Sequence, residues 1–275
     1  MLQKEILIIK LGGSVVTLKH LNRPAIRRLH VKKIASVIFK NYNPKKQTLI
    51  LIHGAGSFGH LHAHRYDLTF GTKDHPEKSF RAIENQSLDA QLNSELVSLF
   101  IASGLPVVGM PTRTLATNTK GKLATLETKN LRAALSVGAV PLLHGDMIFD
   151  TVWGLSICSG DVLVSKLASI FSAEKVFFAS DVDGIFTQDP HRFKNAELIQ
   201  NTSLGEIIKG AFKLSGSHNK DVTGGLSKKF TLFQRNSSLK KIYLFNGIHA
   251  KNFSFVFDQK NFFGTTIQIK KTGQG

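Results

Sequence analysis

The stretch Thr48-Leu-Ile-Leu-Ile-His-Gly-Ala-Gly-Ser-Phe-Gly-His60 joins a short apolar run to a turn with three glycines in six residues. The apolar run predicts a buried β-strand. A glycine-rich turn after a strand lets the backbone come close to an anion. The stretch therefore predicts a phosphate site at residues 53–60, although a plain strand-to-helix turn with two surface histidines explains these residues equally well.

Two familiar phosphate motifs overlap on this turn. Its glycines have the spacing of a dinucleotide-binding turn, but that motif also needs a prompt helix and an acidic residue roughly 20 positions later. Residues 61–78 are polar and rich in histidine, so a dinucleotide site is not expected. A P-loop is not expected either, because His60 stands at the position of its lysine and Leu61 at that of its hydroxyl residue.

Strand and helix patterns alternate along the rest of the chain, which predicts an α/β fold with a mainly parallel sheet. The expected strands are 5–10, 48–52, 106–109, 139–143, 175–179, 241–245 and 265–270. The expected helices are 22–40, 79–103, 131–137, 159–171 and about 227–235, and residues 118–124 and 146–153 are expected to form hairpins.

Further phosphate-suited segments lie at the ends of these elements. Lys10 and two glycines follow the first strand, where open α/β sheets bind ligands. Residues 159–161 begin a helix with free backbone donors, and residues 221–225 place a glycine pair before Lys229. A surface lysine or a helix-opening acid explains each segment singly, but together with residues 53–60 they predict a ligand with several phosphates.

The turn at residues 180–184 carries two aspartates, yet calcium loops need more oxygen donors than this turn offers. We expect no protein-held metal site there, and the two acids suit hydrogen bonds to a nucleoside instead.

Length and charge leave several functions open. The 275 residues suit one large domain or two closely fused lobes. Lys and Arg number 36 against 19 acidic residues, a formal charge of +17 that is spread along the sequence. Such a charge attracts phosphorylated metabolites, acidic lipids or nucleic acid.

The single cysteine, Cys158, excludes an internal disulfide, and its apolar neighbours favour a packed residue over a nucleophile. The amino terminus is too short and too charged for a secretory signal, and no apolar run reaches the roughly 20 residues of a membrane span. We expect a cytoplasmic protein.

Five motifs together resemble the isopentenyl phosphate kinase family, within the amino acid kinase superfamily, over nearly the whole chain. They are Lys10-Leu-Gly-Gly-Ser14, Gly54-Ala-Gly-Ser-Phe-Gly-His60, Ser159-Gly-Asp161, Ser180-Asp-Val-Asp-Gly184 and Asp221-Val-Thr-Gly-Gly225. His60 distinguishes this family from superfamily members that act on carboxylates or nucleoside monophosphates, which generally lack the histidine. Fosfomycin kinases and other small phosphate or phosphonate kinases are the alternative.

The resemblance implies one domain, residues 1–275, with an open, mainly parallel sheet between helical layers. Its acceptor-binding half would be about 1–170 and its ATP-binding half about 171–275. It also implies a homodimer, the cofactors ATP and Mg²⁺, and transfer of phosphate to isopentenyl phosphate for isoprenoid synthesis. A small-molecule phosphate substrate is the implied partner, without specific nucleic-acid binding.

The resemblance also assigns roles to residues. Binding of ATP falls to Lys10, Gly12, Gly13, Ser14, Gly56, Asp181, Gly225 and Lys229. The acceptor phosphate contacts Ala55, His60 and Gly160. The catalytic set is His60, Lys10, Lys19 and Asp161, in which Lys19 stabilises the transferring phosphoryl group and Asp161 holds the lysines.

Two positions depart from the family pattern, because Leu18 and Val162 stand where acidic residues are common. They bear on magnesium binding and on the setting of Lys19, and they remove no catalytic group. A non-enzymatic alternative is a kinase-like protein that senses nucleotides or binds nucleic acid. The complete set of lysines and glycines argues against it.

Overall fold

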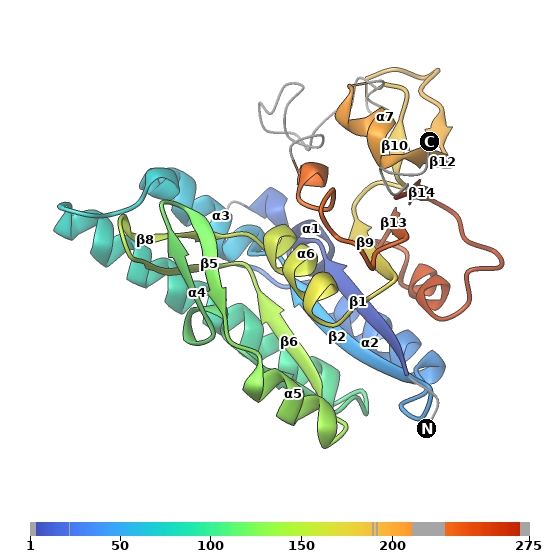
Figure 1. Cartoon of the computed structure of the whole chain (residues 1–275), viewed down its shortest axis with the longest axis horizontal. Coiled ribbons are helices and arrows are strands. Elements are labelled where there is room, and N and C mark those ends of the chain that lie inside the picture. Colours follow the sequence, from blue (N-terminus) through green and yellow to red (C-terminus); the bar gives the residue numbers. More distant parts are fainter. Residues whose placement is uncertain (1–3, 22, 189, 191, 211–228, 270–275) are drawn as a thin grey trace.

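The computed structural model describes residues 4–21, 23–188, 190, 192–210 and 229–269. Its centre is an eight-stranded sheet in the order β12-β14-β13-β9-β1-β2-β6-β3 (Figure 1). The strands are β1 (Glu5–Leu11), β2 (Gln47–His53), β3 (Val107–Gly109), β6 (Val140–His144), β9 (Lys175–Ser180), β12 (Asn201–Ser203), β13 (Lys241–Asn246) and β14 (Thr265–Gln268). All neighbouring pairs are parallel except β13 and β14, so the expected α/β fold with a mainly parallel sheet is confirmed.

The central strand β1 is buried on both faces, as its continuous apolar sequence predicts. Leu7, Ile9 and Leu11 point into one hydrophobic core and Ile8 into the other. This alternation is the two-residue period of a strand, and it divides the molecule into two layers of helices.

One face of the sheet is covered by α2 (Arg28–Asn41), α4 (Pro76–Ile101) and the 3₁₀ helix η4 (Ala250–Val256). The other face is covered by α5 (Lys129–Ser136), α6 (Gly160–Ile170), α7 (Leu204–Ile208) and the segment around Phe230 and Phe233. Phe178 of β9 packs edge-on against both of these rings, which joins the segment to the sheet.

A smaller sheet in the order β5-β4-β7-β8 stands beside α4 and contains both predicted hairpins (Figure 1). Its strands are β4 (Ala116–Thr119), β5 (Lys122–Leu126), β7 (Asp146–Asp150) and β8 (Gly154–Cys158). The short strands β10 (Ile185–Phe186) and β11 (Leu198–Ile199) form a separate pair that the sequence patterns did not predict. None of the helices in the described part combines the length and hydrophobicity of a membrane span.

Some predicted boundaries were wrong. Helix α2 begins at Arg28 instead of residue 22, because Ile26 forms an isolated bridge with Thr17 and holds the chain extended. The helix expected to reach residue 235 is helical at 229–231 and then turns. The turn at 53–60 is shorter than expected, since the helix α3 (Gly56–Arg65) begins inside it.

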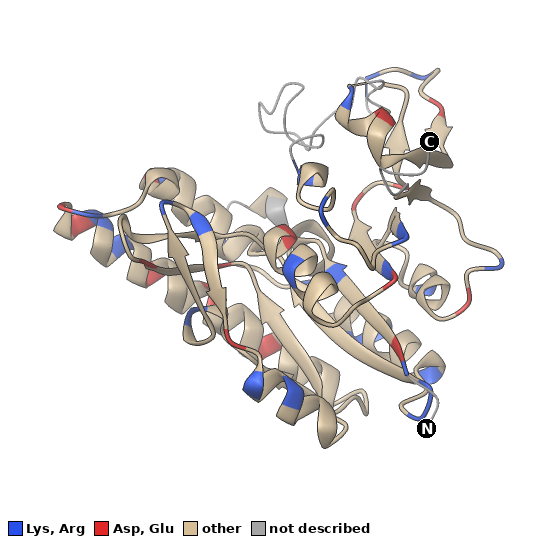
Figure 2. Ribbon diagram, viewed as in Figure 1, with Lys and Arg blue, Asp and Glu red and all other residues tan. Residues whose placement is uncertain are grey.

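One reason given against a dinucleotide site was that no helix promptly follows the glycine turn. This expectation was wrong, because α3 begins at Gly56. The histidines of this stretch differ from each other, since His53 is fully buried and His60 is exposed. Lys and Arg lie on strands, helices and loops throughout the ribbon, as the even spacing in the sequence suggests (Figure 2).

Candidate active site

Two glycine turns meet at the carboxyl ends of β1 and β2. The N–H group of Gly54 donates to Leu11 O at 3.0 Å. A Cβ atom on Gly13 would lie 2.6 Å from both N and Cα of Gly56, and Gly56 has a φ of +55°. Only glycine allows this approach of backbone to backbone and this left-handed conformation. The two predicted phosphate loops therefore form one continuous surface.

Lys10, Asp161 and Lys229 come together beside these turns from three separate parts of the chain. Lys10 Nζ lies 2.5 Å from Asp161 Oδ1, and Lys229 Nζ lies 3.3 Å from the same oxygen. Both ammonium groups also lie over the ring of Phe178, at 5.8 and 5.1 Å from its centroid. One carboxylate thus holds two cations, and the trio keeps one net positive charge.

The electrostatics of the trio follow from this geometry. Burial alone raises the pKa of Asp161, but the charges of Lys10 and Lys229 hold that pKa below its ordinary value. Burial and the neighbouring charge of Lys10 lower the pKa of Lys229 to about 8, against the opposing effect of Asp161. Lys229 is therefore a cation whose charge depends on pH in the neutral to mildly alkaline range.

The helix α6 delivers Asp161 to this position. Ser159 is its N-cap, and the side chain of Ser159 accepts a hydrogen bond from the N–H group of Val162 at 3.3 Å. A Cβ atom on Gly160 would lie 3.3 Å from Lys10 Cε and 3.6 Å from His53 O. The absence of a side chain at Gly160 leaves the lysine room beside the start of α6.

The residues expected at the acceptor phosphate lie on two helices, at the start of α6 and on α3 with its N-cap. Ala55 is the N-cap of α3, and His60 is an exposed residue of that helix. Gly160 adjoins β2 through His53 O, and the N–H group of Gly145 donates to this oxygen at 3.2 Å. Residues of α3, β2 and α6 therefore meet at one end of the sheet.

The residues expected at the nucleotide are placed less completely. The N–H group of Gly12 donates to Ala179 O at 2.9 Å, which ties the first glycine turn to the end of β9, and Asp181 is exposed two residues later. Ser14 lies in the short helix α1 (Gly13–Val16). Lys19 begins the 3₁₀ helix η1 (Lys19–Leu21), and Gly225 lies outside the described residues.

The described ranges contain no group of three or more His, Cys, Asp or Glu side chains arranged to hold a metal ion. Magnesium commonly keeps several waters and uses substrate phosphates with only one or two carboxylates. The donor set therefore suits an ion that arrives with a nucleotide.

A groove of about 600 Å³ lies beside α6. It is lined by Val162, Ser165 and Lys166 of α6 and by Lys122 and Arg235, among others, and includes none of the predicted site residues. Cys158 also borders this groove and is otherwise buried, which confirms it as a packed residue. Burial raises the pKa of its thiol to about 12.

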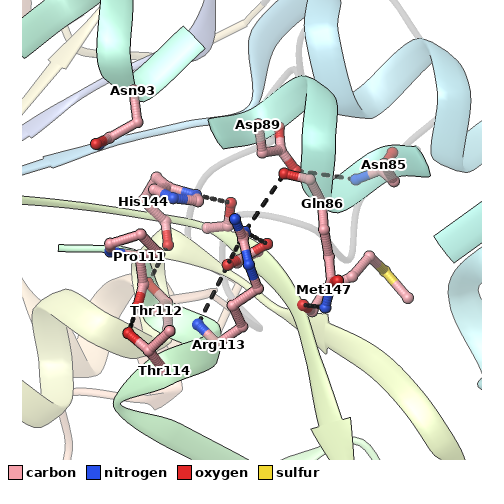
Figure 3. Close-up of polar contacts among 12 residues, drawn as sticks. Asn85, Gln86, Asp89, Asn93, Pro111, Thr112, Arg113, Thr114, His144 and Met147 are labelled. Atoms are coloured by element: carbon pink, nitrogen blue, oxygen red, sulfur yellow. Dashed lines mark hydrogen bonds and ion pairs between the residues drawn. The ribbon is translucent and has the colours of Figure 1, made fainter. Parts of the chain in front are cut away.

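A buried polar cluster beside α3 was missed from the sequence (Figure 3). Helix α4 contributes Asn85, Gln86, Asp89 and Asn93, and it faces Arg113, His144 and Asp146. Arg113 Nη1 donates to Asp146 Oδ2 at 3.0 Å, and Gln86 Nε2 donates to Met147 O at 2.7 Å. Polar residues on an amphipathic helix usually mark its solvent face, so no sequence signal pointed inward.

Two stacked histidines complete this cluster. The rings of His53 and His144 lie 5.1 Å apart, and Asn93 Nδ2 lies 3.1 Å from His53 Nε2. Burial, together with the neighbouring His144, lowers the pKa of His53 to about 3, and burial also lowers the pKa of His144. Both rings are therefore neutral near pH 7.

Known proteins are similar to this chain over most of its length. The amino acid kinase family matches residues 5–233. An isopentenyl phosphate kinase of Methanothermobacter thermautotrophicus is 32% identical over 228 residues, which cover 81% of this chain and 84% of the relative. Another, of Methanocaldococcus jannaschii, is 30% identical over 254 residues, which cover 89% and 92%.

Solved structures give the same result. One isopentenyl phosphate kinase structure superposes with a TM-score of 0.80 at 26% identity, covering 96% of this chain and all (100%) of that one. A product complex of the Thermoplasma acidophilum enzyme superposes with a TM-score of 0.76, also at 26% identity, and again covers 96% of this chain and 100% of that one.

Proposed function

The chain belongs to the amino acid kinase family, and we propose that it transfers the γ-phosphoryl group of ATP to isopentenyl phosphate, giving isopentenyl diphosphate and ADP. The observation that carries the proposal is the trio of Lys10, Asp161 and Lys229 beside two touching glycine turns. Phosphoryl transfer asks a protein mainly for positioning and for cations over the developing charge.

The reaction brings two anions together, and the trio supplies positive charge between them. An oxygen of the acceptor phosphate attacks the γ-phosphorus, the bond from that phosphorus to the bridging oxygen breaks, and ADP leaves. Lys10 and Lys229 face the charge that develops, while Asp161 fixes both ammonium groups without cancelling their combined charge. Lys19, from the segment after the first glycine turn, is proposed to add a further cation.

The acceptor phosphate is proposed to lie against Ala55, His60 and Gly160. It is ionised near neutral pH, so the reaction needs no strong general base. His60 fixes the acceptor by donating a hydrogen bond to its phosphate and offsets part of its charge. The fully buried His53, whose ring is neutral, has no such role.

ATP is proposed to lie over Gly12, Gly13, Ser14 and Gly56 and to extend along the ends of β9 and β13 towards Asp181. This arrangement places the acceptor in the half of about residues 1–170, whose glycine turns also hold the ATP phosphates. The rest of the nucleotide lies in the half of about residues 171–275, with Gly225 on the nucleotide side. Magnesium, when bound with ATP, would neutralise phosphate charge, with phosphate oxygens and water as its main ligands. A homodimer in the cytoplasm is the proposed state of the protein.

An acceptor panel tests this proposal. Purified protein with ATP and magnesium is given isopentenyl phosphate, fosfomycin, N-acetylglutamate or UMP, and ADP release is measured for each acceptor. We expect the highest kcat/KM with isopentenyl phosphate. Turnover of only the carboxylate or only UMP would contradict the proposal, and a preference for fosfomycin would assign the protein to the alternative class.

A further inference from the structure

Two buried hydroxyl groups lie between the first glycine turn and α3, and the proposed reaction does not use either of them. Thr17 is 0% exposed and Ser57 is 1% exposed. With so little exposed surface, these side chains act through the residues that they hold and not through contact with a substrate. Their hydrogen bonds show which residues those are.

The Thr17 hydroxyl group joins the two glycine turns. Thr17 Oγ1 donates to Gly13 O at 2.6 Å and accepts a hydrogen bond from Ser57 N at 3.0 Å. A hydroxyl group can donate and accept at once, which a methyl group of the same size cannot do. A Cβ atom on Gly56 would collide with this oxygen and would lie 2.7 Å from Thr17 Cγ2. The hydroxyl group therefore fixes the start of α3 against the first turn.

The Ser57 hydroxyl group holds the chain again at Ala25. Ala25 N donates to Ser57 Oγ at 3.2 Å, and Ser57 Oγ donates to Ala25 O at 3.4 Å. Leu18 N donates to the same carbonyl oxygen at 2.9 Å, which draws the two ends of the segment 18–25 together. Both ends of this segment are thus anchored at Ser57, one through Thr17 and one directly.

The anchored segment and the anchoring helix carry two different parts of the proposed reaction. The segment contains Lys19, the first residue of η1, which is proposed to meet the transferring phosphoryl group. Ser57 lies in the first turn of α3, one turn before His60, which is proposed to hold the acceptor phosphate. The hydrogen bonds at Ser57 therefore set where the lysine segment stands relative to the acceptor helix.

We propose that Thr17 and Ser57 are positioning residues, which hold the segment of Lys19 at the γ-phosphoryl group while the acceptor on α3 attacks it. This inference rests on the proposed function and adds two residues to it. A charge that is met mainly in the transition state affects kcat more than KM. Loss of either hydroxyl group should therefore lower kcat and leave substrate binding nearly unchanged.

The first measurement compares Thr17→Val with Thr17→Ser. Valine has the shape of threonine without the hydroxyl group, whereas serine keeps that group. We expect Thr17→Val to lower kcat for isopentenyl phosphate by about 10²-fold, because small misplacements of reacting groups have effects of this size. The KM values for ATP and isopentenyl phosphate should change by about twofold or less. Thr17→Ser should keep kcat within about threefold of wild type.

A double-mutant cycle tests whether Thr17 acts through Lys19. If it does, the loss of its hydroxyl group has little left to disturb once the lysine is absent. In the Lys19→Ala background, Thr17→Val should lower kcat by a further threefold or less, against about 10²-fold in the wild-type background. A merely structural role would give the same fall in both backgrounds.

Two further variants separate positioning from general damage. Ser57→Ala removes the bonds to Ala25 but keeps the N–H group that donates to Thr17, so kcat should fall by only about tenfold. It takes the place of Thr17→Val in the cycle if that variant does not fold. Thr202→Val removes another buried hydroxyl group, which donates to Glu206 Oε2 at 2.8 Å, and it should leave kcat unchanged.

Two results would overturn the inference: a wild-type kcat in both Thr17→Val and Ser57→Ala, or an equal fall in kcat with and without Lys19. Failure of the proposed function looks different, because the wild-type protein then does not convert isopentenyl phosphate. If another acceptor of the panel is converted, the same cycle with that acceptor decides the inference. The absence of product from every acceptor would end both proposals.

Discussion

Lys10 Nζ lies 2.5 Å from Asp161 Oδ1, although 151 positions separate the two residues in the sequence. The contact joins the end of the central strand to the start of α6, and Lys229 approaches the same oxygen from the last third of the chain. A partly buried carboxylate shared by two lysines has a cost in desolvation that packing alone does not explain. Function at this position does explain it, and it leads to the first prediction.

Activity should fall above about pH 8, because Lys229 loses its proton as the pH rises through its pKa of about 8. The charged form binds phosphate, so the loss is on the alkaline side. Lys229→Arg should remove this fall in activity at alkaline pH (the alkaline limb of the pH profile), since a guanidinium stays protonated. Asp161→Asn should move the limb to lower pH, because Asp161 raises the pKa of Lys229.

The measurement is kcat/KM for ATP against pH. The control is Lys240→Arg, at an exposed lysine paired with Glu174. An alkaline limb that persists in Lys229→Arg would show that another group controls it.

The contact between the glycine turns gives a second prediction. Gly13→Ala places a Cβ atom 2.6 Å from the backbone of Gly56, so the turns must separate. Overpacking of this kind costs about 1–3 kcal/mol of unfolding free energy. The fall in kcat should be larger than the loss of folded protein explains, because misplaced reacting groups slow the reaction.

Denaturant unfolding and steady-state kinetics measure the two effects. Gly205→Ala is the matched control, because the nearest atom to its new Cβ would be 3.9 Å away. Normal turnover in Gly13→Ala would mean that the two turns do not act together.

Asp150 gives a prediction about stability in the small sheet. Its carboxylate accepts hydrogen bonds from Lys120 N, Gly121 N, Val152 N, Trp153 N and Ser156 Oγ. Burial opposes ionisation, but the donated hydrogen bonds lower the pKa of Asp150 far below its ordinary value. Asp150→Asn should therefore cost about 1.5–3 kcal/mol at neutral pH.

The sign of the pH dependence follows from the lowered pKa. The contribution of Asp150 is complete above its unfolded pKa of about 3.9 and is lost as the pH falls through the lower folded value. The stability gap between wild type and Asp150→Asn should thus narrow below about pH 4 in urea unfolding. Asp258→Asn, at an exposed residue with one such bond, from Lys260 N, is the control. A gap that widens in acid would refute the assignment.

The proposal that the acceptor phosphate lies against α3 depends on His60. His60→Ala should lower kcat/KM for isopentenyl phosphate by about 10²- to 10⁴-fold, or less because no base is required. His60→Gln keeps a neutral donor and should fall between wild type and alanine, and KM for ATP should barely move in either variant. His64→Ala, at another exposed residue of α3, is the control. A large loss of ATP binding in His60→Ala would place this helix at the nucleotide instead.

Much of the framework could be predicted from the sequence. The strands around β1 are continuous apolar runs, which only a sheet covered on both faces explains. Lys10 and Asp161 could be predicted as site residues, because Lys10 stands at the end of a strand and Asp161 at the start of a helix. Their contact with Lys229 through one oxygen depends on tertiary packing and is visible only in the structure.

The polar face of α4 shows where sequence patterns were insufficient. Leu92, Leu96 and Leu99 mark one buried stripe of this helix, and a polar residue such as Asp89 would ordinarily face solvent. The small sheet covers that second face. Its two hairpins could be predicted, but no local pattern predicts that they pair into one sheet through β4 and β7. The start of α2 was missed for a similar reason, since the bridge between Thr17 and Ile26 overrides the helix signal at residues 22–24.

Phosphorus NMR of the complete reaction tests the central claim most directly. Protein, ATP, magnesium and isopentenyl phosphate are mixed and followed with time. Our account predicts that the acceptor signal declines while two coupled diphosphate signals grow in step with ADP, and that Asp161→Asn slows this conversion by about 10²-fold or more. Formation of ADP and inorganic phosphate, with the acceptor signal unchanged, would contradict it.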